Sequence, residues 1–347
     1  MKSKSRSNCH DDEQYFWSTH AKGTRTVKVQ VANQDPYCTN FFQFKKVLVI
    51  GLGQLGLPVA RYVKQRGFDT HGYDVSPKAV ELAQKTAAIE NATTNFSEYD
   101  VFILCVSTHK ADDIFSPQTD SLLSIVQKIS NEAKSGALVS IESTVPKGTS
   151  MKVFEILNHR MHVVHAPHRW YSLEENIHGV NQLRVIGGIC DCCLKAGLAF
   201  YGDSISVNVN AQSYSPSPSS PKSLGIPMHP VKSIEIAELT KVAENAHRYL
   251  QIAFAEELYL YCQANNINFP ELRDALNTKW NVEILEPREG IGGHCLPKDT
   301  KMFLESSNGR NNKILKAAME VDLHYRTYRA RLEHSSNYPV ITKHDSK

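Results

Sequence analysis

The sequence predicts an α/β protein with a doubly wound, Rossmann-type parallel sheet followed by a helical dimerisation and substrate domain. Short apolar, β-branched runs alternate with helix-forming segments through residues 45–210. Repeated strand–helix alternation is typical of a parallel sheet covered by helices on both faces. A stretch with six Ser and five Pro residues within 213–230 then ends the alternation, and helical periodicity dominates beyond it.

Length and composition limit the function classes. A chain of 347 residues has room for about two domains. Its net charge of +3 and its lack of an apolar run of about 20 residues argue against nucleic-acid and membrane partners. The basic N-terminus leads into no apolar signal region, and the eight cysteines are scattered. We therefore expect a cytoplasmic protein.

The first elements follow a polar extension, residues 1–44. KKVLVIG, from Lys45, is apolar and β-branched, which is typical of a buried parallel strand. Helical spacing over 54–66 ends at Gly67, a residue suited to a left-handed C-cap. DTHGYD then predicts a strand, and Pro77 begins a helix. Later strands of the first domain are expected in VFILCVS, ALVSIES, MHVVHA, RVIGG and ISVNV.

The second half is organised differently. We expect a Ser/Pro-rich linker at 211–231, a helical domain at 232–335 that carries a candidate Lys and Cys, and a tail at 336–347. The long helix predicted at 232–265 has more apolar positions than one neighbouring domain readily covers. We therefore expect a homodimer built around this helix.

The segment VIGLGQLG places Gly51, Gly53 and Gly56 in GxGxxG spacing, with Gln54 and Leu55 between the last two glycines. In such a turn the glycines permit a tight bend, close approach of a pyrophosphate and close helix–sheet packing. The phosphates would lie at the positive end of the following helix. The pattern predicts dinucleotide binding, although many glycine-rich turns are purely structural.

Acidic and hydroxyl side chains at strand ends refine this prediction. Asp74 ends the second strand, where a carboxylate accepts hydrogen bonds from ribose hydroxyls and repels a 2′-phosphate, so NAD is favoured. Lys78 keeps NADP open. Two further strand ends could contact the cofactor or be ordinary turns; their candidate residues are Val106, Ser107, Thr108 and Thr144.

Two segments of the second half carry candidate chemistry. Lys241 and Asn245 are four residues apart, so they share a helix face and could donate hydrogen bonds to a substrate oxyanion, or simply be solvated. In GIGGHCLPKD the glycines, including Gly292, expose Cys295. His294 and Lys298 could favour the thiolate, which is the nucleophile, and Asp299 could act as a base.

Taken together, GLGQLG, ESTVPKGT, ELTKVAEN and GIGGHCLPKD resemble the UDP-glucose/GDP-mannose dehydrogenase family, from about Lys45 to Lys301. The resemblance implies NAD-dependent, four-electron oxidation of the C6 hydroxymethyl group of a nucleotide sugar to a carboxylate. Cys295 then matches the nucleophile that forms the thiohemiacetal and thioester. Lys241 and Asn245 match the pair that stabilises negative charge, and Asp299 matches the carboxylate that assists water. Lys298 matches a lysine near the cofactor.

The sequence departs from the family at two places. His168, in HAPHRW, occupies the position of a glutamate that acts as a base in thioester hydrolysis, and a neutral imidazole could do the same work. Only 48 residues follow Asp299, from 347 minus 299, too few for the family's C-terminal nucleotide-binding domain. We therefore expect a short form and leave the sugar and nucleotide open.

Further side chains could contact the substrate. Arg169 and Arg184 are candidates for its phosphates, and Arg288 for the sugar pocket, although each could be a surface charge. We expect no metal site: the histidines at 159, 162, 165 and 168 straddle a helix end and a strand, and CDCC at 190–193 has no second cysteine pair nearby in sequence.

Two other functions remain open. A two-electron β-hydroxyacid dehydrogenase has the same architecture and the Lys–Asn pair, but has no use for Cys295 in GIGGHCLPKD. A non-catalytic NAD-binding or assembly subunit would not need Lys241, Asn245, Cys295 and Asp299 together.

Overall fold

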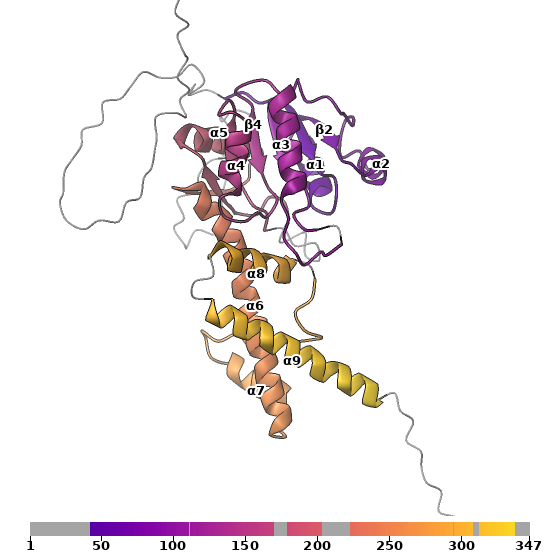
Figure 1. Ribbon diagram of the computed structural model, residues 1–347, viewed down its shortest axis with the longest axis vertical. Helices are drawn as coiled ribbons and strands as arrows, with labels where there is room; N and C mark the ends of the chain where they lie inside the picture. Colours follow the sequence, from indigo (N-terminus) through magenta and orange to yellow (C-terminus); the bar gives the residue numbers. More distant parts are fainter. Residues whose placement is uncertain are drawn as a thin grey trace, which may run out of the picture. The chain divides into compact units, whose positions relative to one another are not determined.

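The computed structural model describes residues 42–110, 112–169, 179–202, 223–293, 295–307 and 312–336. They belong to two compact units (Figure 1). The first unit comprises 1–108 and 119–238, and the second 109–118 and 239–347. Within the described residues, no helix is both long enough and apolar enough to cross a membrane.

The described part of the first unit contains a seven-stranded sheet in the order β2-β1-β3-β4-β5-β6-β7. After β2 the chain returns to the other side of β1, so the winding reverses between β1 and β3. A reversal of this kind opens a ligand crevice at the carboxyl ends of the strands. The strands are β1 (Lys46–Ile50), β2 (Asp69–Tyr73), β3 (Val101–Leu104), β4 (Leu138–Ile141), β5 (His162–His165), β6 (Arg184–Gly188) and β7 (Met228–Val231).

The sheet is parallel except between β5 and β6, which are antiparallel. A parallel neighbour would need a crossover of a dozen or more residues, usually a helix. Among the described residues between β5 and β6 there is no helix, so the chain returns in the opposite direction. The predicted doubly wound parallel sheet is therefore confirmed, with this one antiparallel pairing.

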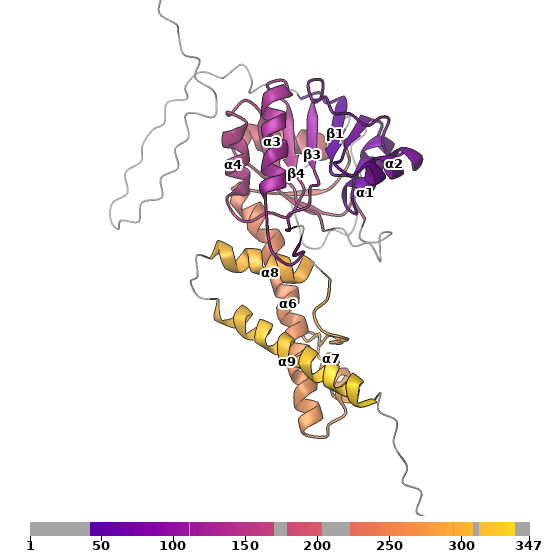
Figure 2. The same cartoon turned by 45° about the vertical axis from the view of Figure 1, so that its right-hand side comes forward.

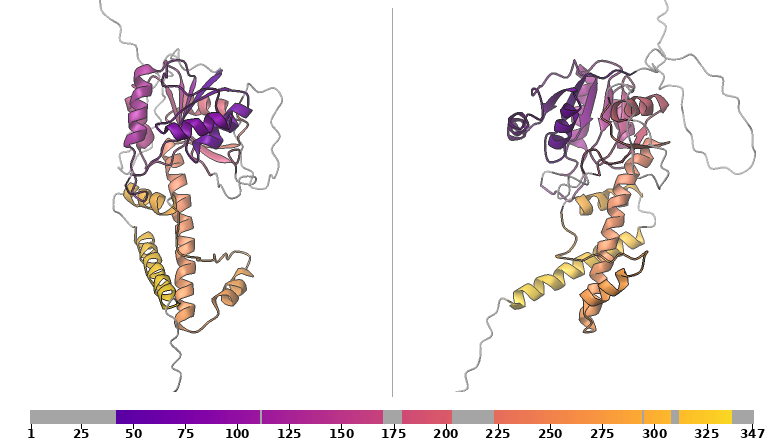
Figure 3. Two further views of the ribbon diagram at one scale, coloured as in Figure 1. Left: turned by 90° about the vertical axis from the view of Figure 1, so that its right-hand side faces the viewer. Right: turned by 180° about the vertical axis from the view of Figure 1, so that it is seen from behind.

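Helices cover both faces of the sheet, as Figures 2 and 3 show. Alternate residues of β1 point to opposite faces: Val47 and Val49 pack with α1 and α5, and Leu48 and Ile50 pack with α3 and α4. The first unit's helices are α1 (Gly56–Gln65), α2 (Pro77–Lys85), α3 (Asp120–Glu132), α4 (Thr149–Ile156) and α5 (Asp191–Tyr201).

Local signals placed several helix ends correctly. Gly67 has the left-handed φ of 83° expected after α1. Ser76 caps α2 by accepting a hydrogen bond from the Ala79 N–H, and Pro77 occupies the first turn. The N-cap of α5 is Cys190. Asp191 lies in the first turn of this helix.

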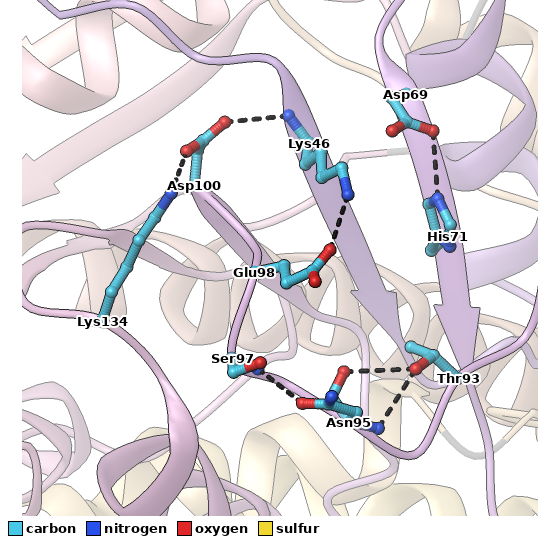
Figure 4. Close-up of polar contacts among 9 residues, drawn as sticks. All are labelled: Lys46, Asp69, His71, Thr93, Asn95, Ser97, Glu98, Asp100 and Lys134. Atoms are coloured by element: carbon cyan, nitrogen blue, oxygen red, sulfur yellow. Dashed lines mark hydrogen bonds and ion pairs between the residues drawn. The ribbon is translucent and has the colours of Figure 1, made fainter.

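Ion pairs connect the amino ends of neighbouring strands of the sheet (Figure 4). The carboxylate of Asp100, just before β3, accepts hydrogen bonds from the backbone N–H groups of Lys45 and Lys46 and pairs with Lys134 at 2.5 Å. Lys46 also pairs with Glu98 at 2.7 Å. These contacts tie β1 to β3 at the edge opposite the crevice.

The second unit is helical. It contains most of α6 (Ile234–Ala264), with α7 (Phe269–Asn277), α8 (Cys295–Ser306) and α9 (Lys313–Ser336). Tyr249 of α6 donates a hydrogen bond to Asp322 of α9, and the rings of Tyr259 and Tyr325 meet edge to face with centroids 5.5 Å apart. Figures 1 and 2 show α9 crossing α6.

One predicted boundary needs correction. The linker predicted at 211–231 includes β7, whose residues pair in parallel with β6 at the edge of the sheet. Pro230 is tolerated there because an edge strand leaves backbone N–H groups unpaired. The strand predicted in ISVNV lies outside the described residues.

Candidate active site

The glycine loop after β1 has the geometry of a tight turn. Gly51 has φ 88°, and a Cβ added to it would lie 2.5 Å from the carbonyl oxygen of Cys105. A Cβ on Gly56 would lie 1.6 Å from the carbonyl oxygen of Gly51. Neither position can hold a side chain without moving the backbone.

Gly53 differs from its neighbours, because a Cβ there would meet no atom within 4 Å. Gly53 and Gln54 are exposed at the start of α1, and Leu55 is its N-cap residue. The absence of a side chain at Gly53 thus leaves open space beside the N-terminus of a helix. A phosphate can approach the backbone in that space, so the loop fits a dinucleotide.

Asp74 is held beside this loop. Its carboxylate accepts one hydrogen bond from the Leu52 N–H at 2.6 Å and one from the Ser76 N–H at 2.7 Å. These bonds fix a half-buried carboxylate at the end of β2, and each oxygen keeps a further lone pair. The arrangement suits the hydrogen bonds that a ribose would donate.

The ends of β3 and β4 are joined by hydroxyl groups. Thr108 donates to the carbonyl oxygen of Thr144 at 2.8 Å, and Ser143 donates to the carbonyl oxygen of Val106 at 2.7 Å. Ser107 between them is exposed. The predicted cofactor-side segments therefore lie side by side at the carboxyl edge.

A charged network is buried behind this edge, and its centre, Glu142, was not predicted as a site residue. One Glu142 oxygen accepts from Arg184 at 3.1 Å and from Tyr201 at 2.5 Å, and the other contacts Nε2 of His168. Tyr201 also bonds Ser140 at 2.6 Å. Burial raises the pKa of Glu142, but the opposing influence of His168 and Arg184 is larger and holds it at about 2.

This network changes the interpretation of two candidates. Arg184 was expected to contact a substrate phosphate, but its side chain is 1% exposed and pairs with Glu142 and with the carbonyl oxygen of Val180. Its guanidinium therefore stabilises the interior. His168 is buried against Glu142, while Arg169 is half-buried and donates to the carbonyl oxygen of Leu183.

No local pattern reveals the network, because Glu142 and Arg184 are 42 residues apart. The available signal was the charge itself. Glu142 follows directly on a four-residue buried strand, and Arg184 begins another buried strand. A charge beside a buried strand usually requires a partner of opposite sign.

The second unit brings three predicted residues together. Asn245 of α6 donates a hydrogen bond to Oδ2 of Asp299 at 2.5 Å, and Nζ of Lys298 lies 2.8 Å from the other oxygen. Lys298 and Asp299 are buried in the first turns of α8. An amide, an ammonium and a carboxylate thus form one cluster.

Cys295 is the exposed first residue of α8. Desolvation of the thiol by surrounding atoms raises its pKa, and Asp299 adds to this rise. The ammonium groups of Lys298 and Lys241 act in the opposite direction without overcoming it. The expectation that Lys298 favours the thiolate is therefore right in sign but outweighed. His294 lies outside the described residues.

The remaining substrate candidates lie in the loop before α8. Arg288 is exposed in a left-handed conformation with φ 51°, and its carbonyl oxygen accepts a hydrogen bond from Tyr325. A Cβ on exposed Gly292 would meet no atom within 4 Å. Trp280 is 92% exposed, so it does not serve core packing.

Comparisons with known families identify both halves of the chain. Residues 82–203 match the NAD binding domain of the UDP-glucose/GDP-mannose dehydrogenase family, and residues 235–323 match its central domain. Residues 17–123 also match the NAD binding domain of D-isomer specific 2-hydroxyacid dehydrogenases. The chain therefore has the NAD-binding domain that its glycine loop predicts.

Individual proteins agree with these matches. UDP-N-acetyl-D-mannosamine dehydrogenase of Methanococcus maripaludis is 30% identical over 302 residues, which are 81% of this chain and 66% of that protein. The solved UDP-D-ManNAc dehydrogenase of Pyrococcus horikoshii is 25% identical with a TM-score of 0.68, over 84% of this chain and 71% of that one.

A solved 3-hydroxyisobutyrate dehydrogenase of Mycobacterium tuberculosis shares the fold alone. It is 13% identical with a TM-score of 0.60, over 83% of this chain and 94% of that one. The two family matches instead cover consecutive parts of the sequence and together more than half of it. On these grounds the chain belongs to the UDP-glucose/GDP-mannose dehydrogenase family.

Proposed function

We propose that the protein oxidises the C6 hydroxymethyl group of a UDP-sugar to a carboxylate, with two NAD reduced per sugar. The observation that carries this proposal is the exposed thiol of Cys295 at the start of α8, the helix that also carries Lys298 and Asp299; Asn245 of α6 donates a hydrogen bond to Asp299. A two-electron dehydrogenase needs no thiol. A covalent adduct, by contrast, restores a carbinol hydrogen to the aldehyde and allows a second oxidation.

Bound NAD supplies the acceptor for two hydrides. The reaction balances as R–CH₂OH + 2 NAD⁺ + H₂O → R–COO⁻ + 2 NADH + 3 H⁺. Lys241 and Asn245 donate hydrogen bonds to the substrate oxygen as its negative charge develops. Such fixed donors stabilise the transition state, and this stabilisation is usually the largest single part of the rate enhancement. Asp299 orients the Asn245 amide through their hydrogen bond.

Cys295 acts between the two oxidations. Its raised pKa keeps the sulfur protonated at rest, so the thiol gives up its proton as the sulfur attacks the aldehyde carbon. The S–C bond forms, and the proton passes to the carbonyl oxygen to give a thiohemiacetal. Oxidation of this adduct gives a thioester, and attack by water then breaks the C–S bond and returns the thiol.

His168 is our candidate for the base that takes a proton from this water. Its contact with the Glu142 carboxylate fixes the ring and stabilises the imidazolium that forms. His168→Gln should slow thioester hydrolysis in a single turnover and leave the first oxidation unchanged. Equal hydrolysis rates in the two proteins would remove His168 from the mechanism.

The substrate panel should begin with UDP-N-acetyl-D-mannosamine, because several of the relatives carry its name. The decisive measurement is NADH formed per sugar consumed, with two expected. Cys295→Ser should form no thioester and should lower uronate production by several orders of magnitude, while Cys262→Ser, at a buried thiol of α6, should match wild type.

The second candidate function is that of a β-hydroxyacid dehydrogenase. The solved 3-hydroxyisobutyrate dehydrogenase shares the fold of this chain over 94% of its own length. A protein with this function would use Lys241 and Asn245 and yield one NADH per substrate. One NADH with a small hydroxyacid, and none with any sugar nucleotide, would replace the first proposal by this one.

We further propose a homodimer built around α6. Phe254 and Tyr261 are seven residues apart on one face of this helix and are 56% and 57% exposed. Leu323 of α9 is 68% exposed. A second copy would cover these side chains, so light scattering should give twice the chain mass and F254E should reduce it. A monomeric wild type at micromolar concentration would contradict the dimer.

A further inference from the structure

Four metal-binding side chains meet at the amino edge of the sheet, away from the crevice. Sγ of Cys190 lies 3.0 Å from that of Cys192 and 3.4 Å from that of Cys193. One ring nitrogen of His162 lies within 4.8 Å of the sulfurs of Cys192 and Cys193. The sulfurs of Cys192 and Cys193 and the His162 nitrogen therefore form one group, and the sulfur of Cys190 adjoins it beside both other sulfurs.

The fold explains why they converge. His162 is the first residue of β5, and its side chain lies on the face that α5 covers. Because β6 runs antiparallel to β5, it ends near the start of β5 and delivers Cys190 there. Cys192 and Cys193 then occupy the first turn of α5. A separation of 30 residues in sequence, from 162 to 192, thus becomes a contact.

We propose that this cluster is a structural zinc site with one tetrahedral Zn²⁺ and the ligands Cys190, Cys192, Cys193 and His162. Three cysteines and one histidine form a usual ligand set for structural zinc. Zn–S bonds of about 2.3 Å place tetrahedral sulfurs about 3.8 Å apart. The sulfurs therefore need to separate by a few tenths of an ångström from 3.4 Å and by somewhat more from 3.0 Å. The sulfur of Cys190, which lies outside the group formed with His162, also has to move toward the imidazole.

The surroundings also suit a metal thiolate. The N–H of Val163 donates to Sγ of Cys193 at 3.4 Å, and the N-terminus of α5 offsets negative charge at Cys192 and Cys193. Cys193 and His162 are buried, whereas Cys190 and Cys192 are half-buried, which leaves the ion a path of entry.

Binding is balanced in charge and protons. Three thiols release three protons to solvent, and His162 binds as neutral imidazole. Zn²⁺ with three thiolates carries one negative charge. The site lies at the amino edge of the sheet, as the strand directions require, so the ion would join β5 to α5 and take no part in the oxidation.

The test uses the full chain, without a polyhistidine tag, purified under a reductant. Elemental analysis should find one zinc per chain, and Co²⁺ added to the metal-free protein should give the visible bands of tetrahedral cobalt together with thiolate charge transfer. Cys192→Ser and His162→Asn should reduce zinc to background. His229→Asn, at an exposed histidine of β7, and Cys262→Ser should retain it.

Stability gives a second readout. Zinc at 100 times its Kd should raise Tm by about 5–10 °C in wild type, because binding then contributes about 2.7 kcal/mol. Cys192→Ser should show no such rise. Wild type that binds no stoichiometric zinc, cobalt without a tetrahedral spectrum, or a Cys190–Cys192 disulfide that persists under the reductant would each overturn the proposal.

Discussion

Each unit contains a buried glutamate whose pKa is shifted, and the shifts of Glu142 and Glu256 have opposite directions. Glu142 in the first unit and Glu256 in the second are 1% and 0% exposed. The pKa of Glu142 is lowered to about 2, whereas that of Glu256 is raised to about 8. Burial raises both values, so the difference comes from the neighbours.

Glu142 has cationic and hydroxyl partners, while Glu256 lies next to another acid. Arg184, His168 and Tyr201 surround Glu142. After burial itself, Asp322 is the main cause of the raised pKa of Glu256, and Arg326 offsets only part of it. Asp322 itself accepts hydrogen bonds from Tyr249, Arg326 and the Ile291 N–H. The comparison shows that partners decide the sign of the shift.

The two glutamates therefore affect stability at different pH. Glu142 stabilises the fold above its unfolded pKa of about 4.5, and this stabilisation is lost as pH falls toward 2. Between about pH 4.5 and 8, folded Glu256 binds more protons than unfolded Glu256, so its contribution to the free energy of unfolding falls as pH rises.

Removing one cationic partner of Glu142 should have the largest effect. Arg184→Met leaves the buried carboxylate with His168 as its one cationic partner and should lower the free energy of unfolding by about 3–5 kcal/mol. Urea denaturation at pH 7 measures it. The double variant Glu142→Leu/Arg184→Met should recover most of the loss. A single variant within about 1 kcal/mol of wild type would show that the pair does not hold the charge.

Placing a second carboxylate beside Asp299, as Asp322 lies beside Glu256, should have the next largest effect. Asn245→Asp replaces the donor to Asp299 by a second carboxylate. The turnover number should fall about 10²–10³-fold, the loss typical of one oxyanion donor. Lower pH should restore part of it, because the two carboxylates would share a proton. An unchanged turnover number would exclude Asn245 as a donor to the substrate.

Neutralising Glu256 should stabilise the protein. Glu256→Gln removes the cost of ionising a buried acid beside Asp322. It should raise the free energy of unfolding at pH 8.5, by at most the roughly 4–5 kcal/mol that a full shift from 4.5 to about 8 represents, and should change it little at pH 4.5. Unfolding measured at both pH values tests this. Glu257→Gln, at the exposed neighbour, is the matched control and should change neither value. Equal gains at both pH values would contradict a raised pKa.

Removing one donor from Glu142 should have the smallest effect. Tyr201→Phe deletes a hydroxyl that bonds Glu142 and Ser140, and it should cost about 1.5–3 kcal/mol. Arg184 and His168 would still hold Glu142 as an anion, so the acid side of the stability profile should keep its shape. A shift of that transition toward pH 4.5 would mean that Tyr201, rather than Arg184, sets the pKa.

Local elements could be predicted from the sequence because their causes are local. The glycine turn, the Ser76 cap and the left-handed Gly67 each depend on residues a few positions apart. The pairing of Asn245 with Asp299 and of Arg184 with Glu142 could not, since each joins residues more than 40 positions apart. The proximity of His162 to Cys192, 30 positions away, could not be predicted either. Periodicity does not report which distant segments meet.

The three glycines of the turn after β1 also differ in what an alanine would do. At Gly51 or Gly56 the added methyl group would overlap a carbonyl oxygen, so misfolded chains are the expected product. At Gly53 the methyl group enters open space, so the polypeptide should reach its native structure and yet be unable to dock the coenzyme. Gly53→Ala would thus give a folded protein that does not bind NAD, and comparison with it would measure every effect of bound NAD.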